Sequence, residues 1–152
     1  MRKDIAFKQS NLLILLGLLL FLLGLIAGLF VQQLPNPRMA LAAHLEGLMN
    51  GIFLVLMGLI WRRLQLADFW RSMAFGLLVY GSFANLVAVL LAAATGYGKM
   101  MPIAGGREGK GPAESLISFL LVSLSISMLI ACIVVIIGFC RSMNKPSTVL
   151  EK

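Results

Sequence analysis

A histidine, a glutamate and an asparagine lie close together in a stretch of the chain that is otherwise apolar. His44, the only histidine in the sequence, is followed by Glu46 and Asn50. An imidazole can ligate a metal ion or exchange a proton, a carboxyl group can donate or accept a proton, and an amide can orient a polar substrate. Ionisable groups inside an apolar segment are costly and indicate function. This segment is therefore the first candidate for a functional site.

In a helix these three side chains point in different directions. At about 100° per residue, Glu46 and Asn50 share one face, whereas His44 points about 120° away from Asn50 and about 160° away from Glu46. One polar face can look into a bundle of helices. The other must also avoid lipid, which is most easily achieved against a second subunit. The spacing thus predicts a homo-oligomer with chemistry at its interface.

A later apolar segment adds a second group of polar and aromatic residues. Asn85 lies near the middle of that segment, and Tyr80 and Phe83 lie within two helical turns of it. An amide and an aromatic ring on one helix can together bind a small aromatic substrate. We therefore expect these three residues to line a cavity.

The lone histidine has two interpretations. His44 is either hydrogen-bonded to a neighbouring helix or the ligand of a metal or haem. A closed zinc site takes four ligands and a catalytic one usually three, but the chain has no second histidine and no suitably placed cysteine pair. A haem needs only one protein ligand and leaves its opposite position open for a substrate. For Glu46, Asn50 and Asn85 the structural alternative is hydrogen bonding between helices.

The composition predicts the elements that position these residues. Hydrophobic residues make up 60% of the chain and charged residues 12%, and the mean hydropathy is +0.96. A membrane-spanning helix needs about 20 apolar residues, and four windows provide them. They are residues 11–31, 39–61, 73–95 and 115–139. We expect an all-α, integral membrane four-helix bundle that forms one membrane domain over residues 1–152. The first window is too long for a signal peptide.

The basic residues predict an orientation in the membrane. The formal net charge is +7, and the 13 basic residues divide into nine on the side of the termini and four on the other side. Because they flank apolar spans, they indicate contact with lipid headgroups and exclude a nucleic-acid function. Both termini are expected in the cytoplasm, in a bacterial-type inner membrane. The glycine-rich connector 96–112 is expected to be a flexible outer loop, and Trp61 and Tyr97 are expected to lie at the membrane interfaces.

Pairs of glycines predict where the helices approach each other. Gly24 and Gly28 are four residues apart in the first window, as are Gly47 and Gly51 in the second. Such pairs let helix backbones come close in lipid. We therefore expect the first two helices to be tightly packed.

Residues 36–51, which read Asn-Pro-Arg-Met-Ala-Leu-Ala-Ala-His-Leu-Glu-Gly-Leu-Met-Asn-Gly, closely resemble the hydroxylaminobenzene mutases. The whole chain is similar to their four-helix layout, and the related styrene oxide isomerases have a similar His-x5-Asn-Gly element. The resemblance implies a b-type haem held between the subunits of a trimer. It makes His44 the axial ligand of the haem iron and places Asn50 beside the substrate. The segment 83–85, Phe-Ala-Asn, is similar to a Trp-Ser-Asn element of the isomerases, which implies that Phe83 and Asn85 belong to the substrate pocket.

Two positions separate the mutases from the isomerases. The epoxide isomerase has a tyrosine where this chain has Val89, and Glu46 belongs to the His-Leu-Glu-Gly wording of the mutases. The resemblance therefore implies that an arylhydroxylamine is rearranged to an aminophenol, a step typical of nitroaromatic degradation. Ferric haem b would act as the Lewis acid, Asn50 and Asn85 would orient the substrate, and Glu46 would move a proton.

Three other functions remain as alternatives. An epoxide isomerase of the styrene oxide type fits the shared histidine element. A small proton-coupled multidrug exporter fits four short helices with one buried acid, although the acid of such proteins typically lies in the first helix and here it lies in the second. An electron-transfer haem protein would more often have two axial ligands, and this chain has one histidine.

Overall fold

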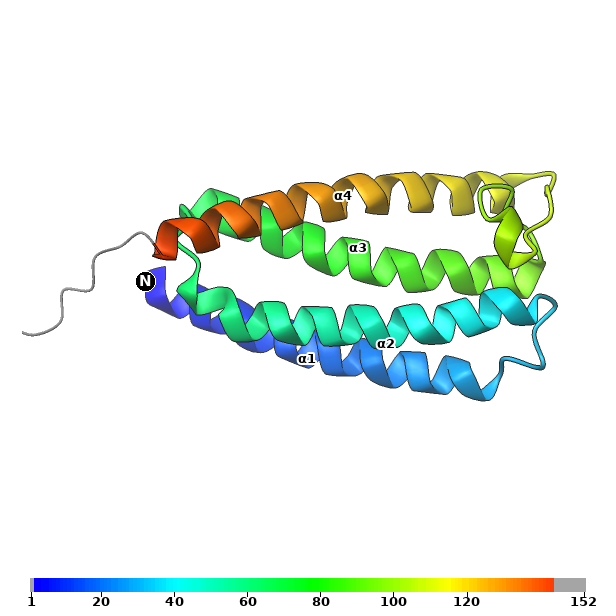
Figure 1. Cartoon of the computed structure of the whole chain (residues 1–152), viewed down its shortest axis with the longest axis horizontal. Coiled ribbons are helices and arrows are strands. Elements are labelled where there is room, and N and C mark those ends of the chain that lie inside the picture. Colours follow the sequence, from blue (N-terminus) through cyan, green and yellow to red (C-terminus); the bar gives the residue numbers. More distant parts are fainter. Residues whose placement is uncertain (1, 144–152) are drawn as a thin grey trace, which may run out of the picture.

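A computed structural model describes residues 2–143 of the chain and places most of them in four long helices (Figure 1). These are α1 (Arg2–Leu29), α2 (Pro37–Ile60), α3 (Asp68–Thr95) and α4 (Pro112–Met143), with short 3-10 helices η1 (Trp61–Arg63) and η2 (Pro102–Ala104) between them. No β-strand occurs within this part of the chain, so the all-α prediction is confirmed. All four helices are long and apolar enough to cross a membrane. The protein is therefore a multi-pass membrane protein.

Glycines bring α1 and α2 into close contact along most of their length. A Cβ atom added to Gly47 would lie 2.5 Å from the Cα atom of Gly24, and one added to Gly51 would lie 2.7 Å from the backbone nitrogen of Phe21. Backbone atoms cannot move out of the way as a flexible side chain can. The packing role predicted for the glycine pair in α2 is thus confirmed, and α1 and α2 form one tight hairpin.

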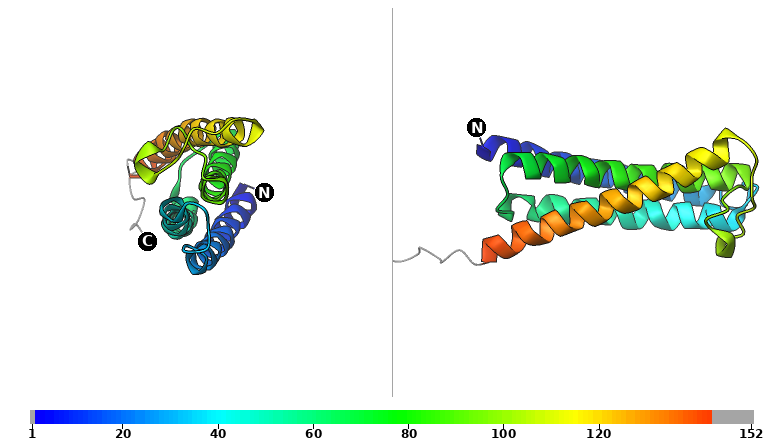
Figure 2. Two further views of the ribbon diagram at one scale, coloured as in Figure 1. Left: turned by 90° about the vertical axis from the view of Figure 1, so that its right-hand side faces the viewer. Right: turned by 90° about the horizontal axis from the view of Figure 1, so that it is seen from above.

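The second hairpin, α3 with α4, packs against the first through α3. Figure 2 shows α4 crossing the bundle diagonally, with α1 and α4 on opposite sides of the α2 and α3 pair. Serines of α4 return their hydroxyl hydrogen bonds to their own helix, as Ser125 does to the carbonyl of Leu121 at 2.7 Å. The central position of α3 makes it the most buried of the four helices.

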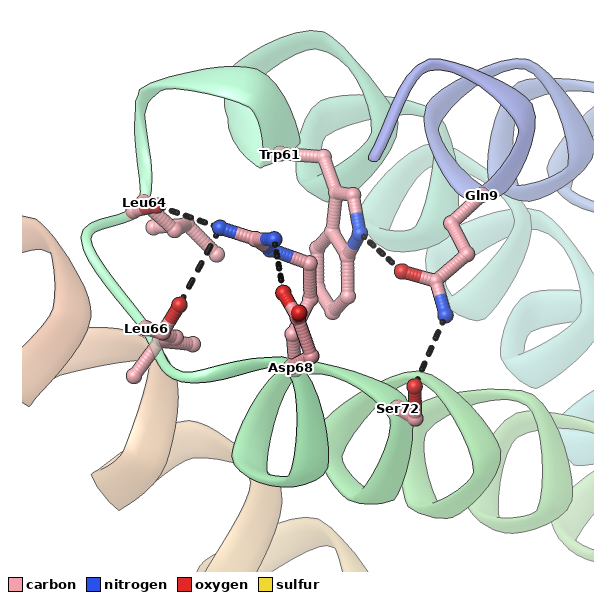
Figure 3. Close-up of polar contacts among 7 residues, drawn as sticks. Gln9, Trp61, Leu64, Leu66, Asp68 and Ser72 are labelled. Atoms are coloured by element: carbon pink, nitrogen blue, oxygen red, sulfur yellow. Dashed lines mark hydrogen bonds and ion pairs between the residues drawn. The ribbon is translucent and has the colours of Figure 1, made fainter. Parts of the chain in front are cut away.

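Trp61 lies inside the bundle, at the end of α2. Its side chain is fully buried, its Nε1 donates to Oε1 of Gln9 at 3.1 Å, and its ring packs edge-on against Phe75. Gln9 in turn donates to the hydroxyl of Ser72 at 3.4 Å, which links three helices (Figure 3). Trp61 lies at the end of α2, as expected of a residue at a membrane interface, but its ring is buried within the bundle and cannot serve as a lipid-contacting anchor. The partly buried side chain of Gln9 satisfies the indole N–H that water would otherwise bind.

One arginine holds the turn between α2 and α3. Arg71 donates to the carbonyl oxygens of Leu64 and Leu66 at 3.3 and 3.2 Å, and its guanidinium lies 3.3 Å from the carboxylate of Asp68 (Figure 3). These carbonyls have no helical partner, so the side chain satisfies groups that would otherwise be left unpaired. Arg71 therefore has a structural role in the turn between α2 and α3.

The connector between α3 and α4 has a defined conformation, in contrast to the flexible loop expected from its glycines. Glu114 is buried at the start of α4, and its carboxylate accepts hydrogen bonds from the backbone N–H groups of Gly98, Lys99 and Gly109 at 3.0 to 3.2 Å. The hydroxyl of Ser118 donates to the same carboxylate at 3.3 Å. One buried acid thus organises most of the connector, which no local sequence pattern indicates.

Candidate functional site

His44 lies on α2 with its ring against α1. Its Nδ1 atom is 2.8 Å from the carbonyl oxygen of Gly24. Because a carbonyl oxygen can only accept a hydrogen bond, Nδ1 must carry the hydrogen, and the neutral ring then has its lone pair on Nε2. Ligating histidines in proteins are commonly held in this way, with the second nitrogen bound to a carbonyl. The backbone of α1 therefore fixes both the orientation and the tautomer of this imidazole.

Gly28 makes room for the ring. A Cβ atom at this position would lie 2.6 Å from Nδ1 of His44 and 3.0 Å from the neighbouring ring carbon. The sequence predicted that Gly28 allows two helix backbones to approach. The structure places it instead against the imidazole, one turn away from the carbonyl of Gly24 that the ring binds. Any side chain at this position would displace the histidine.

A groove opens beside the imidazole on the outside of the α1 and α2 hairpin. It has a volume of about 510 Å³. Its walls are mostly aliphatic, and two amide side chains lie at its end near the α1 to α2 turn. The lining residues are Leu25, Gly28, Leu29, Val31, Gln32, Gln33, Leu41 and His44. The groove therefore offers one nitrogen ligand among apolar walls.

Glu46 lies on the other side of α2, where that helix meets α3. Nδ2 of Asn85 donates to Oε2 of Glu46 at 2.6 Å, and Nδ2 of Asn50 donates to the same oxygen at 3.5 Å. The structure gives Oε1 no hydrogen-bond partner among the described residues. The shared face predicted for Glu46 and Asn50 is thus confirmed, and Asn85 joins them from α3. Two amides fix one carboxyl oxygen and leave the other available.

The predicted site residues therefore form two groups rather than one. His44 faces α1 and the outer groove, whereas Glu46, Asn50 and Asn85 meet between α2 and α3. This separation follows from the angles between these positions on the helix. A reaction that uses both groups must take place around the edge of α2 or between two protomers.

The two aromatic candidates lie apart from the carboxyl group. The hydroxyl of Tyr80 is 2.6 Å from the hydroxyl of Ser123, so this side chain is directed to α4, while Asn85 is directed to α2. Phe83 is partly buried and packs against the hydrophobic core. The cavity expected to contain Tyr80, Phe83 and Asn85 together is not apparent from these contacts. The predicted pocket role of the two rings stays a prediction.

The donor set of the described chain fits a cofactor held by a single ligand. Within residues 2–143, no group of three or more histidine, cysteine, aspartate or glutamate side chains could hold a metal ion. Both cysteines in that range are free. His44 with its available Nε2 is therefore the principal ligand candidate.

Two residues outside the predicted site have surroundings that sequence reasoning did not predict. Ser82 is fully buried on α3, and its hydroxyl has no hydrogen-bond partner in the structure. Asn36 is buried and caps α2, with Pro37 at the first helical position. An asparagine followed by proline before an apolar run is a known start signal for a helix, so this role could have been read from the sequence. The burial of the Ser82 hydroxyl without a hydrogen-bond partner could not have been read from the sequence.

Four helices that can each cross a membrane, with an imidazole and a carboxyl group among their apolar residues, define a multi-pass membrane protein with polar groups inside its membrane-spanning segments. A sequence profile described as styrene oxide isomerase matches residues 9–140. The chain belongs to the styrene oxide isomerase family.

Two curated relatives make the comparison more specific. Hydroxylaminobenzene mutase HabB of Ectopseudomonas oleovorans is 49% identical over 128 residues, which cover 83% of this chain and 78% of that protein. Hydroxylaminobenzene mutase HabA of the same organism is 47% identical over 127 residues, or 82% of this chain and 94% of that protein. No solved structure matches the chain. The relatives and the family together make the protein an isomerase.

Proposed function

We propose that the protein is a hydroxylaminobenzene mutase that rearranges an arylhydroxylamine to an aminophenol. Two relatives at 49% and 47% identity carry that name. The observation that carries the proposal is the hydrogen bond from Nδ1 of His44 to the carbonyl of Gly24, which leaves Nε2 as an available ligand. The sequence motif His-Leu-Glu-Gly, in which Glu46 accepts hydrogen bonds from two amide side chains, supports mutase activity over epoxide isomerase activity.

His44 would hold a ferric haem b by its Nε2 atom. Gly28 supports this assignment because it leaves room for the imidazole in this orientation, and the mostly aliphatic groove that His44 lines suits a flat apolar group. When bound, the haem supplies a Lewis acid that polarises the bond between nitrogen and oxygen of the substrate. The hydrogen bond to the carbonyl of Gly24 holds the ring in place for ligation through Nε2.

Glu46 would handle the protons of the rearrangement. The bond between nitrogen and the hydroxyl oxygen breaks, and a bond from a hydroxyl to a ring carbon forms. That ring carbon loses one proton and the nitrogen gains one to become the amine, so no proton or electron is gained or lost overall. Because the amides of Asn85 and Asn50 donate to Oε2, a proton on this carboxyl group resides on Oε1. Oε1 can therefore protonate the departing oxygen and later accept the ring proton.

A homo-oligomer, which we take to be a trimer, would complete the site. His44 and Glu46 lie on different sides of α2, so a neighbouring protomer must close the groove and exclude lipid and water from it. An apolar aromatic substrate can reach this groove directly from the bilayer. Asn50, which lies beside Glu46 on α2, would contact the polar end of the substrate.

The cellular placement follows from the charge distribution. The four basic residues on the side of the 96–112 connector are outnumbered by the nine on the side of the termini. We therefore propose that both termini are cytoplasmic and that the protein resides in a bacterial inner membrane. A role in nitroaromatic degradation is consistent with this placement, since small aromatic compounds concentrate in bilayers.

Isomerisation of an epoxide of the styrene oxide type is the second candidate, because the family is described by that activity. The resemblance to the epoxide isomerases implies a tyrosine at the position of Val89, which in this chain is buried on α3 with 4% of its surface exposed. No phenol is available at that position. The second activity is therefore expected to be weak.

The proposal is tested with the full-length protein purified in detergent from cells supplied with haem. We expect a strong Soret band in the wild type, its loss in His44→Ala, and conversion of phenylhydroxylamine to aminophenol without added reductant. Gly76→Ala is the matched control, because a Cβ atom there meets nothing within 4 Å. A colourless wild type, or a His44→Ala protein that retains full turnover, would contradict the haem mechanism. Faster turnover of styrene oxide would contradict the mutase assignment.

A further inference from the structure

A second concave site lies where the turn between α1 and α2 meets the connector between α3 and α4. It has a volume of about 250 Å³ and is open on one side. Two arginines border it, Arg38 from the first turn of α2 and Arg107 from the connector, with Asn36, Gly96 and Gly105 between them. It shares no lining residue with the groove of His44. The function proposed above does not use it.

The floor of this pocket is held in place by Asn36. Its backbone N–H donates to the carbonyl of Ala93 at the end of α3 at 3.1 Å. Its side-chain nitrogen donates to the carbonyls of Ala104 and Gly105 at 3.2 and 3.1 Å, and its side-chain oxygen accepts from two amides of the first turn of α2. The backbone and side chain of this one buried residue thus link α2, the end of α3 and the connector. Because the helix amides are already bound, a ligand of this pocket must be held by side chains.

Both arginines project from fixed backbone. The N–H of Arg107 donates to the carbonyl of Gly96 at 3.1 Å, and its carbonyl accepts from the N–H of Gly98 at 3.0 Å. Arg38 follows directly after Pro37 in the capped first turn of α2. Gly96 and Gly105 line the pocket without side chains and have φ of 73° and 77°. The backbone therefore fixes the position from which each arginine side chain extends.

Neither guanidinium group is neutralised within the described part of the chain. Both side chains are exposed, and no carboxylate of residues 2–143 forms an ion pair with Arg38 or Arg107. Two positive charges at the rim of one pocket attract an anion. The planar fork of a guanidinium group matches the oxygens of a phosphate, which it can bind through two parallel hydrogen bonds.

We propose that this pocket binds the phosphate of an anionic phospholipid. The pocket lies between the first residues of α2 and the last residues of α3, which is the level of the headgroups for helices that cross the bilayer. Basic pockets between membrane helices bind anionic headgroups elsewhere. A bound headgroup bridges the two hairpins, because Arg38 belongs to the first and Arg107 to the connector of the second.

The test measures lipid binding to the full-length protein by native mass spectrometry in detergent, with phosphatidylglycerol as the probe. The variant Arg38→Gln/Arg107→Gln removes both charges, and Lys99→Gln/Lys110→Gln removes two charges from the same connector outside the pocket. We expect the arginine variant to bind phosphatidylglycerol at least about tenfold more weakly than the wild type, because charge-assisted hydrogen bonds are lost. The lysine variant is expected to stay close to the wild type. Equal affinities of the wild type and the arginine variant overturn the proposal.

A second series identifies the source of the phosphate and the role of geometry. Inorganic phosphate that binds the wild type as tightly as phosphatidylglycerol would make the ligand a soluble phosphate and overturn the lipid assignment. Arg38→Lys/Arg107→Lys keeps the charges without the planar fork, and we expect binding between those of the wild type and the glutamine variant. This variant keeps the test decisive if the glutamine variant does not fold. If the glutamine variant loses the cofactor absorbance but binds phosphatidylglycerol as the wild type does, the two arginines would be reassigned to cofactor binding and the proposal would be overturned.

Discussion

Replacing Gly28 with alanine tests whether α1 orients the histidine. The added Cβ atom would lie 2.6 Å from Nδ1 of His44, whereas ordinary contact begins near 3.4 Å. The ring must therefore retreat by about 0.8 Å. If it moves directly away from α1, its 2.8 Å hydrogen bond to Gly24 lengthens to about 3.6 Å, which is no longer a hydrogen bond. The variant thus removes the support of the imidazole and leaves the imidazole itself intact.

The expected consequence is weaker haem binding rather than a loss of folding. Removing the hydrogen-bond partner of a ligating histidine typically lowers metal affinity about 10- to 100-fold. A hydrogen bond between membrane helices is worth about 1 to 2 kcal/mol in model peptides, which corresponds to a factor of about 5 to 30. The assay is a titration of haem-free protein with haem, followed by the Soret band, together with thermal unfolding of the same samples.

Two other glycines serve as controls for this experiment. Gly76→Ala meets no atom within 4 Å and should leave both haem affinity and stability unchanged. Gly24→Ala places a Cβ atom 2.8 Å from the backbone of Gly47 and should lower the melting temperature through α1 and α2 packing. A Gly28→Ala protein that binds haem as the Gly76→Ala protein does would refute the reasoning.

Three further substitutions test other parts of the structure. Glu46→Gln should lower kcat for phenylhydroxylamine by about 10²- to 10⁴-fold with an unchanged Soret band, because the proton-transferring oxygen is lost. An unchanged kcat would exclude a role of Glu46 in proton transfer. Asn85→Ala should lower kcat by a smaller factor. Glu114→Ala should lower the melting temperature by several degrees because three backbone N–H groups lose their acceptor. Glu108→Ala is the control, because Glu108 is exposed and its replacement should not change the melting temperature. Equal melting temperatures of the two variants would contradict the role of Glu114 in the connector. Ser82→Ala should leave the melting temperature unchanged or raise it, because it removes a buried hydroxyl without a partner; a clear decrease would show that the hydroxyl is bound.

The four helices were predictable because apolar runs of the required length dominate the sequence. The separation of His44 from Glu46 was also predictable, since helix geometry alone places them on different faces. What the sequence could not provide was the partner of each side chain. The bond from His44 to Gly24 depends on how α1 is positioned against α2, and that position is set by packing between residues far apart in the chain.

The errors at the helix ends have the same origin. Trp61 occurs where an interfacial tryptophan would be expected, but Gln9 satisfies its N–H inside the bundle. The connector 96–112 has the composition of a flexible loop, yet Glu114 beyond its end binds its backbone. Both features depend on one polar side chain that reaches a distant segment. Local propensity does not encode such contacts, so they became visible only in the folded chain.

The bond between Glu46 and Asn85 also has a mechanical consequence. Each hairpin is tightly packed within itself, and the two are joined where α2 meets α3, which is where this 2.6 Å contact crosses from one to the other. If Glu46 moves protons as proposed, the carboxyl group that serves the reaction is also one of the polar contacts that join the two hairpins. A change in its protonation state would then alter a contact between α2 and α3 as well as the chemistry.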